Sequence, residues 1–439
     1  MSQLYSPTNR VTLAPGLFLI GTLALSCLSS TFFKQQDHIL AQQDIPTIKY
    51  RNLVIDLGNG VKTNAQLTLP AEGEGPFPAV LLIHGSGALD KNETAGLDVH
   101  NDDGPKPYWQ IAQYLSERGF AVLRYDKRGV GAYQITDQNV WGNATVNDLI
   151  HDAGNALNIL AAQPEVDPQR ISVIGHSEGT IIAPRVAIDN SSKVKNLILM
   201  GAAAQNLVGD ILRYQVVDHP LEYAMHVLDK NHTGLVSIQQ IAKDPLLGFY
   251  LVPSSLLDSN STKAITDSLV EKFGTTDHVS IQKQIRPALI KYYENQTAFN
   301  LSKCNNIRGC PVWLRSELSL IPNLSIIGNI SNSTGILILN GENDSQTTVQ
   351  QAFLLQQRLT DVNHPDHTLI TYPNLGHVFY PSPQWFTEIG PIEPYVLADL
   401  YAWLESHSGL SHSFVSPTTG NLTSKSTDMG SNSSSSESR

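Results

Sequence analysis

A serine between two glycines is the residue in this sequence that most clearly points to chemistry. In "ISVIGHSEGTIIAPRVAI", residues 171 to 188, Ser177 lies between Gly175 and Gly179, after one apolar run and before another. Glycines at these positions remove Cβ atoms that would collide where a strand passes directly into a helix. The pattern predicts a strained strand-to-helix turn that exposes the Ser177 hydroxyl, as a nucleophile requires.

Two residues later in the chain have the types that such a nucleophile needs. A serine hydroxyl is weakly nucleophilic at neutral pH, so an imidazole must take its proton and a carboxylate must orient that imidazole. With a turn of this kind, the acid and then the histidine follow the serine, each after a later strand. Asp344 follows "ILILNGEN" and His377 follows "LITYPNLG". We predict that Ser177, Asp344 and His377 form a catalytic triad.

Three further residues are alternatives for the last two roles. Glu342 lies two residues before Asp344 and could supply the carboxylate in its place. His364 and His367 lie in the polar turn "DVNHPDHT", where we expect solvated loop histidines. The order and spacing along the chain favour Asp344 and His377 over all three.

Negative charge that develops on a substrate oxygen needs hydrogen-bond donors already in place. One predicted donor is the backbone N–H of Glu178, directly after the nucleophile, and the second comes from the loop after an earlier strand. That loop is "HGSG", in which Ser86 and Gly85 are both candidates. We expect the side chains of His84 and Glu178 to brace the structure.

The segment "RYDKRGVG" closes another predicted strand and carries several charges. Asp126 and Arg128 could line a pocket, but an ion pair that holds neighbouring loops together is the more common role for such charges. We therefore predict a structural ion pair here.

Alternating strands and helices must position these residues. Residues 51 to 70 alternate apolar and polar side chains around Gly-Asn-Gly, which predicts a two-stranded hairpin. Short, continuous apolar runs then alternate with helical periods, which predicts a mostly parallel sheet covered by helices on both faces. The predicted strands lie in "PFPAVLLIHGSG", "FAVLRYDKRG", "RISVIGHSEG", "VKNLILMGAA", "GILILNGEND" and "HTLITYPNLGH".

The alternation is interrupted between about Gln205 and Ser333, which predicts an insertion between two parts of one core. The tail is nearly all Ser, Thr, Gly and Asn, too poor in apolar side chains to fold. The predicted divisions are a signal peptide or membrane anchor at 1–45, the first part of the core at 46–205, the insertion at 206–332, the second part of the core at 333–408 and a disordered tail at 409–439.

The N-terminus predicts export or anchorage. No charged residue occurs from Val11 to Phe33, and Arg10 precedes this stretch. We expect an extracellular or cell-surface protein, with the segment either cleaved or retained as a membrane attachment. Thirteen Asn-x-Ser/Thr sequons agree with a glycosylated exterior, the alternative being a chain that is simply rich in Asn and Ser. The sequons begin at Asn92, Asn143, Asn190, Asn231, Asn260, Asn295, Asn300, Asn323, Asn329, Asn332, Asn343, Asn421 and Asn432.

Three further sequence features narrow the expected modifications and partners. Because Asn343 adjoins the predicted acid, we expect it to carry no glycan. In an oxidising compartment, Cys304 and Cys310 predict a local disulfide. The net charge of −11, the pI of about 5.7 and the absence of a basic run in the sequence give no footprint for a phosphate backbone, so we expect no nucleic-acid partner.

These motifs together resemble the α/β-hydrolase superfamily, and within it serine esterase- and lipase-like members. The resemblance rests on His-Gly-Ser-Gly followed by Asp90, on Tyr-Asp-Lys-Arg-Gly-Val-Gly and on Gly-His-Ser-Glu-Gly, and it covers about 50–205 and 333–408. It implies an α/β-hydrolase fold, a cap formed by the insertion, and hydrolysis of a small-molecule carboxylic ester through an acyl-enzyme carried by Ser177, Asp344 and His377. It implies no required cofactor.

The insertion contains a stretch, "DKNHTGLVSIQQ", that fits an EF-hand calcium loop in most positions. Position 12 is a glutamine where a bidentate glutamate is expected, so one aspartate carries the only formal ligand charge, and we expect calcium binding to be weak or lost. The ligand positions are Asp229, Asn231, Thr233, Leu235 and Gln240.

The sequence therefore favours an exported serine hydrolase that acts on carboxylic esters. A serine peptidase or acyltransferase would use the same triad, since the triad serves any acyl transfer. A non-catalytic, hydrolase-like binding protein is the alternative from another class, and it would not require all three triad residues to be present in this order.

Overall fold

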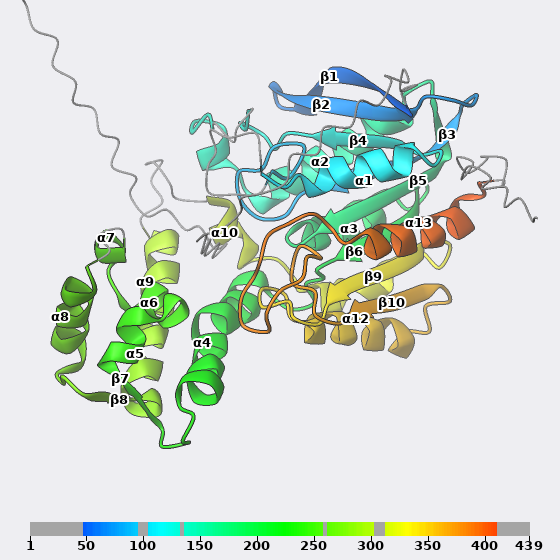
Figure 1. The fold of residues 1–439 in the computed structure, drawn as a ribbon. Helices are drawn as coiled ribbons and strands as arrows, with labels where there is room; N and C mark the ends of the chain where they lie inside the picture. Colours follow the sequence, from blue (N-terminus) through cyan, green and yellow to red (C-terminus); the bar gives the residue numbers. More distant parts are fainter. Residues whose placement is uncertain (1–46, 95–103, 132–135, 258–260, 303–311, 411–439) are drawn as a thin grey trace, which may run out of the picture.

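The computed structural model describes residues 47–94, 104–131, 136–257, 261–302 and 312–410 (Figure 1). The predicted N-terminal export segment, the predicted disulfide between Cys304 and Cys310, and all but the first two residues of the predicted tail lie outside these residues. None of the helices within the described residues is both long and apolar enough to span a bilayer.

An eight-stranded sheet forms the centre of the fold (Figure 1). Strand β2 runs antiparallel to β1 and to β4, and the remaining neighbours pair in parallel. In spatial order the strands are β1 (Ile48–Gly58), β2 (Val61–Pro70), β4 (Ala121–Tyr125), β3 (Phe77–Ile83), β5 (Val166–His176), β6 (Val194–Met200), β9 (Gly335–Gly341) and β10 (His367–Tyr372). The predicted hairpin and mostly parallel sheet are confirmed.

Helices cover both faces of the sheet, because its central strands are apolar on both sides. In β3, Val80 and Leu82 pack into one core cluster while Leu81 and Ile83 pack into the other, as expected for side chains that alternate between two faces. One cluster includes the apolar faces of α1 (Pro107–Ser116) and α13 (Pro394–Ser408); the other includes those of α2 (Val146–Ala161), α3 (Gly179–Asp189) and α12 (Val349–Asp361).

The chain between β6 and β9 forms the insertion, and part of it makes a lobe beside the sheet (Figure 1). It begins with a long run of π and α turns and contains a small second sheet in which β7 and β8 pair antiparallel. Its elements are η3 (Leu207–Leu212), η4 (Tyr214–Asp218), α4 (His219–Tyr223), η5 (Ala224–Leu228), β7 (Leu235–Ser237), α5 (Ile238–Lys243), α6 (Pro245–Leu251), α7 (Ser254–Leu257), α8 (Thr262–Phe273), β8 (His278–Ser280), η6 (Ile281–Ile285), α9 (Arg286–Ser302), α10 (Val312–Glu317), α11 (Asn323–Ile326) and η7 (Ile327–Asn329).

The turn between β5 and α3 has the strain that its sequence predicts. Ser177 has φ of 55°, a left-handed conformation that non-glycine residues seldom adopt. A Cβ at Gly175 would lie 2.2 Å from the carbonyl oxygen of Gly179, and a Cβ at Gly179 would lie 2.0 Å from the carbonyl oxygen of Ile83. The two glycines therefore permit β5, α3 and β3 to approach one another around the serine.

Substitution of Gly179 by alanine tests this close approach. We expect Gly179→Ala to lower the free energy of unfolding by at least about 2 kcal/mol, because the new methyl group meets a backbone carbonyl in a packed core. The matched control is Gly154→Ala in α2, where a Cβ meets nothing within 4 Å and alanine should add about 0.5–1 kcal/mol through its higher helix propensity. Equal stabilities of the two variants in urea titrations would contradict the proposed packing.

Candidate active site

Several loops that follow parallel strands meet at one edge of the sheet. Ser177 follows β5, Asp344 lies three residues beyond β9, and His377 lies five residues beyond β10. Because neighbouring parallel strands end at the same edge, these loops converge there. The Gly85–Ser86 loop, which follows β3, lies at the same edge.

Asp344 and His377 form a buried pair. Oδ2 of Asp344 lies 2.8 Å from Nδ1 of His377, and the Thr347 hydroxyl donates to the same carboxylate oxygen over 3.0 Å. The backbone amides of Gln346 and Thr347 donate to the other oxygen. Because a carboxylate only accepts, Nδ1 carries the hydrogen and Nε2 is left as the basic nitrogen.

The alternative residues lie elsewhere in the structure. The Glu342 side chain is exposed and accepts a hydrogen bond from Thr371. His364 is buried, so the expectation of a solvated histidine is wrong for it, and its imidazole lies against the carbonyl of Ser331. His367 is the first residue of β10, and its ring lies against the carbonyl of His364. The structure thus pairs Asp344 with His377 and leaves the three alternatives apart from that pair.

Ser177 and His377 both lie beside the carboxyl end of β6. The amide of Ser177 donates to the carbonyl of Met200 over 3.0 Å, and a Cβ on Gly201 would lie 3.2 Å from the His377 ring. No hydrogen bond between the Ser177 hydroxyl and this imidazole occurs within the described residues. Such contacts are commonly long in a site without substrate and shorten when substrate binds.

A second buried histidine connects this site to the loop after β3. Nδ1 of His176 lies 3.0 Å from the Glu93 carboxylate, and its Nε2 lies 3.1 Å from the carbonyl oxygen of His377. Burial lowers the pKa of His176, but the adjacent Glu93 carboxylate outweighs burial, so the pKa is raised. The same carboxylate accepts the backbone N–H of Gly85.

That last hydrogen bond corrects one part of the predicted oxyanion hole. The Gly85 amide is committed to Glu93, so it is not free to bind a substrate oxygen. Among the described residues, the backbone amides of Ser86 and Glu178 have no hydrogen-bond partner. These two amides remain as the candidate donors.

The charged side chains behind the site brace its loops. Nζ of Lys127 lies 2.8 Å from the buried Glu178 carboxylate and also donates to the Gly85 carbonyl. The His84 ring packs against two tyrosines, and burial, together with the charge of Lys127, lowers its pKa to about 4. At neutral pH His84 is therefore uncharged. The contact with Lys127 agrees with a bracing role for the Glu178 side chain, whereas His84 contributes ring packing.

Arg128 forms the structural ion pair that the sequence predicts. Its guanidinium holds the Asp152 carboxylate through two bonds of 2.7 and 2.6 Å, and it contacts Asp148 at 3.1 Å. Asp126 instead pairs with Lys91, at 3.7 Å, and accepts the Lys91 amide. Both interactions join the segment after β4 to neighbouring elements.

Comparison with known proteins agrees with this architecture. Residues 106–233 match the family described as "Serine aminopeptidase, S33", and residues 292–411 match the "Prolyl oligopeptidase family". The chain has the α/β-hydrolase fold, and its sequence is similar to serine hydrolase families over these two ranges. Each match covers less than a third of the chain, so neither narrower family is assigned to the whole of it.

The similar proteins include named esterases. The chain is 36% identical over 153 residues to the esterase EstD of Thermotoga maritima, covering 34% of this chain and 33% of that protein. It is 27% identical over 167 residues to the esterase FrsA of Citrobacter koseri, covering 38% and 35%. The chain thus spans about a third of the length of these relatives. Among solved structures, the α/β hydrolase GrgF from Penicillium is 17% identical with a TM-score of 0.46, covering 82% of this chain and 100% of GrgF, a likeness too low to inform function.

The insertion contacts both the helix that follows Ser177 and the loop that carries Asp344. The amide of Asn323 donates to the carbonyls of Thr180 and Ala203, over 2.8 and 2.7 Å. Gln215 donates to the carbonyl of Gln346, two residues from Asp344. The insertion is therefore tied to the core on two sides of the candidate site.

The EF-hand-like loop is held by its own side chains. Both carboxylate oxygens of Asp229 accept hydrogen bonds from Thr233 and Gly234. The Gln240 side chain accepts from Ser237 and so completes the capping box of α5. Leu235 begins β7, which pairs with β8, while Asn231 lies in the exposed part of the turn. That calcium binding is weak or lost here stays a prediction, which rests on the single formal charge among the ligand positions.

A buried glutamate of the insertion lies close to Glu178 and Lys127. Glu317, at the end of α10, is 1% exposed. Burial, and secondly the nearby Glu178 carboxylate, raise its pKa well above the ordinary value, although Arg185 and Lys127 act in the opposite direction. At a pH between the ordinary glutamate pKa and the raised one, the folded chain therefore keeps a proton that the unfolded chain releases.

Substitution of Glu317 by glutamine tests this buried acid. A raised pKa in the folded state means that stability is lost as the pH rises above the ordinary glutamate pKa, because only the unfolded chain then ionises freely. Glutamine carries no such proton, so Glu317→Gln should raise the melting temperature relative to wild type by about 2 °C or more at pH 8. The difference should shrink towards pH 4.5 in thermal scans. A difference independent of pH would contradict a raised pKa.

Proposed function

We propose that this α/β hydrolase cleaves carboxylic esters through an acyl-enzyme formed on Ser177. The observation that carries the proposal is the buried Asp344–His377 pair. The His377 ring lies beside Gly201, directly after the residue of β6 that accepts the Ser177 amide. A hydroxyl on a strained turn, an oriented imidazole and two unpaired backbone amides are the groups that acyl transfer needs.

The residues account for each proton in the reaction. His377 Nε2 takes the hydroxyl proton as Ser177 attacks the ester carbonyl, and the Asp344 carboxylate stabilises the imidazolium that forms. The amides of Glu178 and Ser86 stabilise the charge on the carbonyl oxygen. His377 then protonates the leaving alcohol, and a water molecule, activated by the same imidazole, releases the acid and regenerates the serine. This chemistry requires no cofactor.

The proposal extends to where the enzyme works. The uncharged N-terminal stretch and the sequons support export to the cell exterior, with cleavage or membrane attachment of the leader. The side-chain amides of Asn343 and Asn323 are engaged with backbone carbonyls, so glycans at these two sequons would break interactions of the fold. Glycosylation should be confined to exposed sequons.

Chemical labelling tests the proposed nucleophile and base. Wild-type protein should react with a fluorophosphonate probe, and Ser177→Ala should lose this labelling together with esterase activity. His377→Ala should lower kcat by up to about a millionfold, because the hydroxyl then lacks its base. Circular dichroism controls for folding of both variants. Labelling that persists in Ser177→Ala would remove Ser177 from this role.

A peptidase or acyltransferase is the second candidate, favoured by the two family matches, which carry peptidase names. A panel of p-nitrophenyl esters measured against aminoacyl p-nitroanilides separates the two. We expect kcat/KM for the esters to exceed that for the amides. The reverse order would favour the peptidase, and absence of turnover on both panels would favour a binding protein.

A further inference from the structure

We propose that Lys127 is a positioning residue that aims both amides of the oxyanion hole, an inference that rests on the proposed esterase function. Lys127 does not touch the substrate in this proposal. It acts through the two loops that carry Ser86 and Glu178.

The first contact orients the Ser86 amide. Lys127 donates to the carbonyl oxygen of Gly85, and that carbonyl and the Ser86 N–H belong to one peptide group. A peptide group is planar and trans, so its C=O and N–H point in opposite directions, and fixing the oxygen fixes the direction of the N–H. A charged donor on the oxygen also polarises the group and makes the N–H a stronger donor.

Glu93 holds the same residue from the other side. Its carboxylate accepts the Gly85 N–H, while Lys127 holds the Gly85 carbonyl. Both polar groups of Gly85 are thus bound to buried charges of opposite sign. Rotation of the Gly85–Ser86 peptide would break the contact with Lys127.

The second contact sets the distance between the two donors. Nζ of Lys127 lies 2.8 Å from the carboxylate of Glu178, and the backbone N–H of Glu178 is the other candidate oxyanion donor. One ammonium group therefore links the loop after β3 to the start of α3. The backbone amides of Ser86 and Glu178 lie on separate elements, and the Lys127 ammonium holds them at a fixed separation.

Because Lys127 is buried, its charge needs an explanation other than packing. Lys127 is 3% exposed, and a buried charge is costly unless it is paired. A buried ion pair is often no more stabilising than apolar residues of the same volume, so stability alone does not explain the charge.

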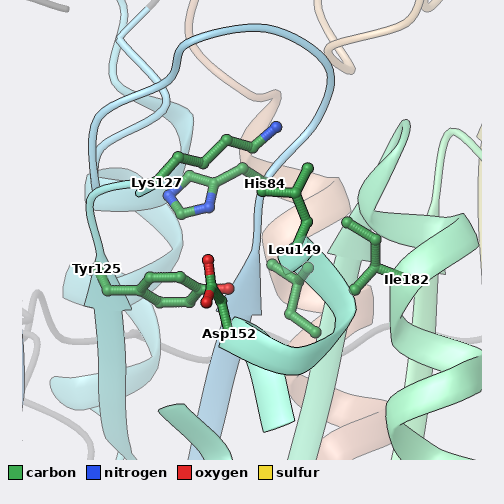
Figure 2. A pocket seen from close by; sticks show the side chains of 7 residues that line it. His84, Tyr125, Lys127, Leu149, Asp152 and Ile182 are labelled. Carbon is green, nitrogen blue, oxygen red and sulfur yellow. The ribbon is translucent and has the colours of Figure 1, made fainter. Parts of the chain in front are cut away.

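Figure 2 shows where the ammonium group points. Lys127 extends along the cavity formed with His84, Tyr125 and Asp152, and its nitrogen lies away from the Asp152 carboxylate. Asp152 is already neutralised by Arg128. The charge of Lys127 is therefore directed to the Gly85 carbonyl and Glu178.

Kinetics of Lys127→Met test the inference. We expect kcat on a p-nitrophenyl ester that wild type cleaves to fall by about 10- to 100-fold, somewhat less than the cost of deleting an oxyanion donor, with KM within about twofold. The Ki of an alkyl trifluoromethyl ketone, whose adduct places an alkoxide in the oxyanion hole, should rise by the same factor as kcat/KM falls. A residue with a purely structural role would not make the Ki of the ketone rise by the same factor as kcat/KM falls.

A double variant separates positioning from folding. Lys127→Met alone leaves the Glu178 carboxylate buried and unpaired, which can destabilise the chain. Lys127→Met combined with Glu178→Gln removes that charge, so the melting temperature should recover while kcat stays low, because the Gly85 carbonyl still lacks its donor. Lys91→Met, which removes a neighbouring lysine paired with Asp126, is the matched control and should keep kcat within about twofold.

The outcomes distinguish this inference from the proposed function. Wild-type kcat in Lys127→Met, with activity that depends on Ser177, overturns the inference alone. Recovery of kcat together with melting temperature in the double variant also overturns it, because Lys127 would then be structural. Wild-type protein without Ser177-dependent ester cleavage overturns the proposed function and this inference with it.

Discussion

The close approach of β3, β5 and α3 is the constraint on which the rest of the site depends. Three backbones meet where Gly179 lies against the Ile83 carbonyl, closer than any side chain would allow. This contact brings the end of β3, and with it the Gly85–Ser86 peptide, beside the serine that follows β5. Without it, neither a left-handed Ser177 nor a donor from the β3 loop would lie at the same point of the sheet edge.

Buried charges then fix the orientation of peptide groups that backbone packing alone does not fix. Glycine-rich loops provide the close approach but little rigidity, because glycine has wide conformational freedom. Glu93 and Lys127 hold the two polar groups of Gly85, and Glu93 also holds His176. Each of these charges has a hydrogen-bonded partner of opposite charge or a backbone dipole, which makes its burial tolerable. In this proposal, the buried charges of Glu93 and Lys127 thus orient backbone amides of the site.

The sequence predicts those parts of the site that depend on local chain geometry. Ser177 is found because its turn needs glycines at fixed offsets, and Asp344 and His377 because they follow buried strands in the expected order. Glu93 and Lys127 escape prediction because their roles depend on partners far away in the chain, such as Glu93 with His176 and Lys127 with Glu178. The choice between Ser86 and Gly85 needed the structure for the same reason, since the side chain that occupies the Gly85 amide comes from a different part of the loop.

The insertion likewise combines contacts to the core with local contacts inside its own lobe. Its contacts with the core lie at both of its ends, where Asn323 reaches α3 and Gln215 reaches the loop of Asp344. The β7–β8 pair and the EF-hand-like loop between these ends stabilise the lobe through local hydrogen bonds and strand pairing. The lobe and the contacts at the two ends are therefore separable parts of the insertion. A change confined to the lobe leaves in place the hydrogen bonds of Asn323 to α3 and of Gln215 to the loop of Asp344, because none of these bonds involves a lobe residue.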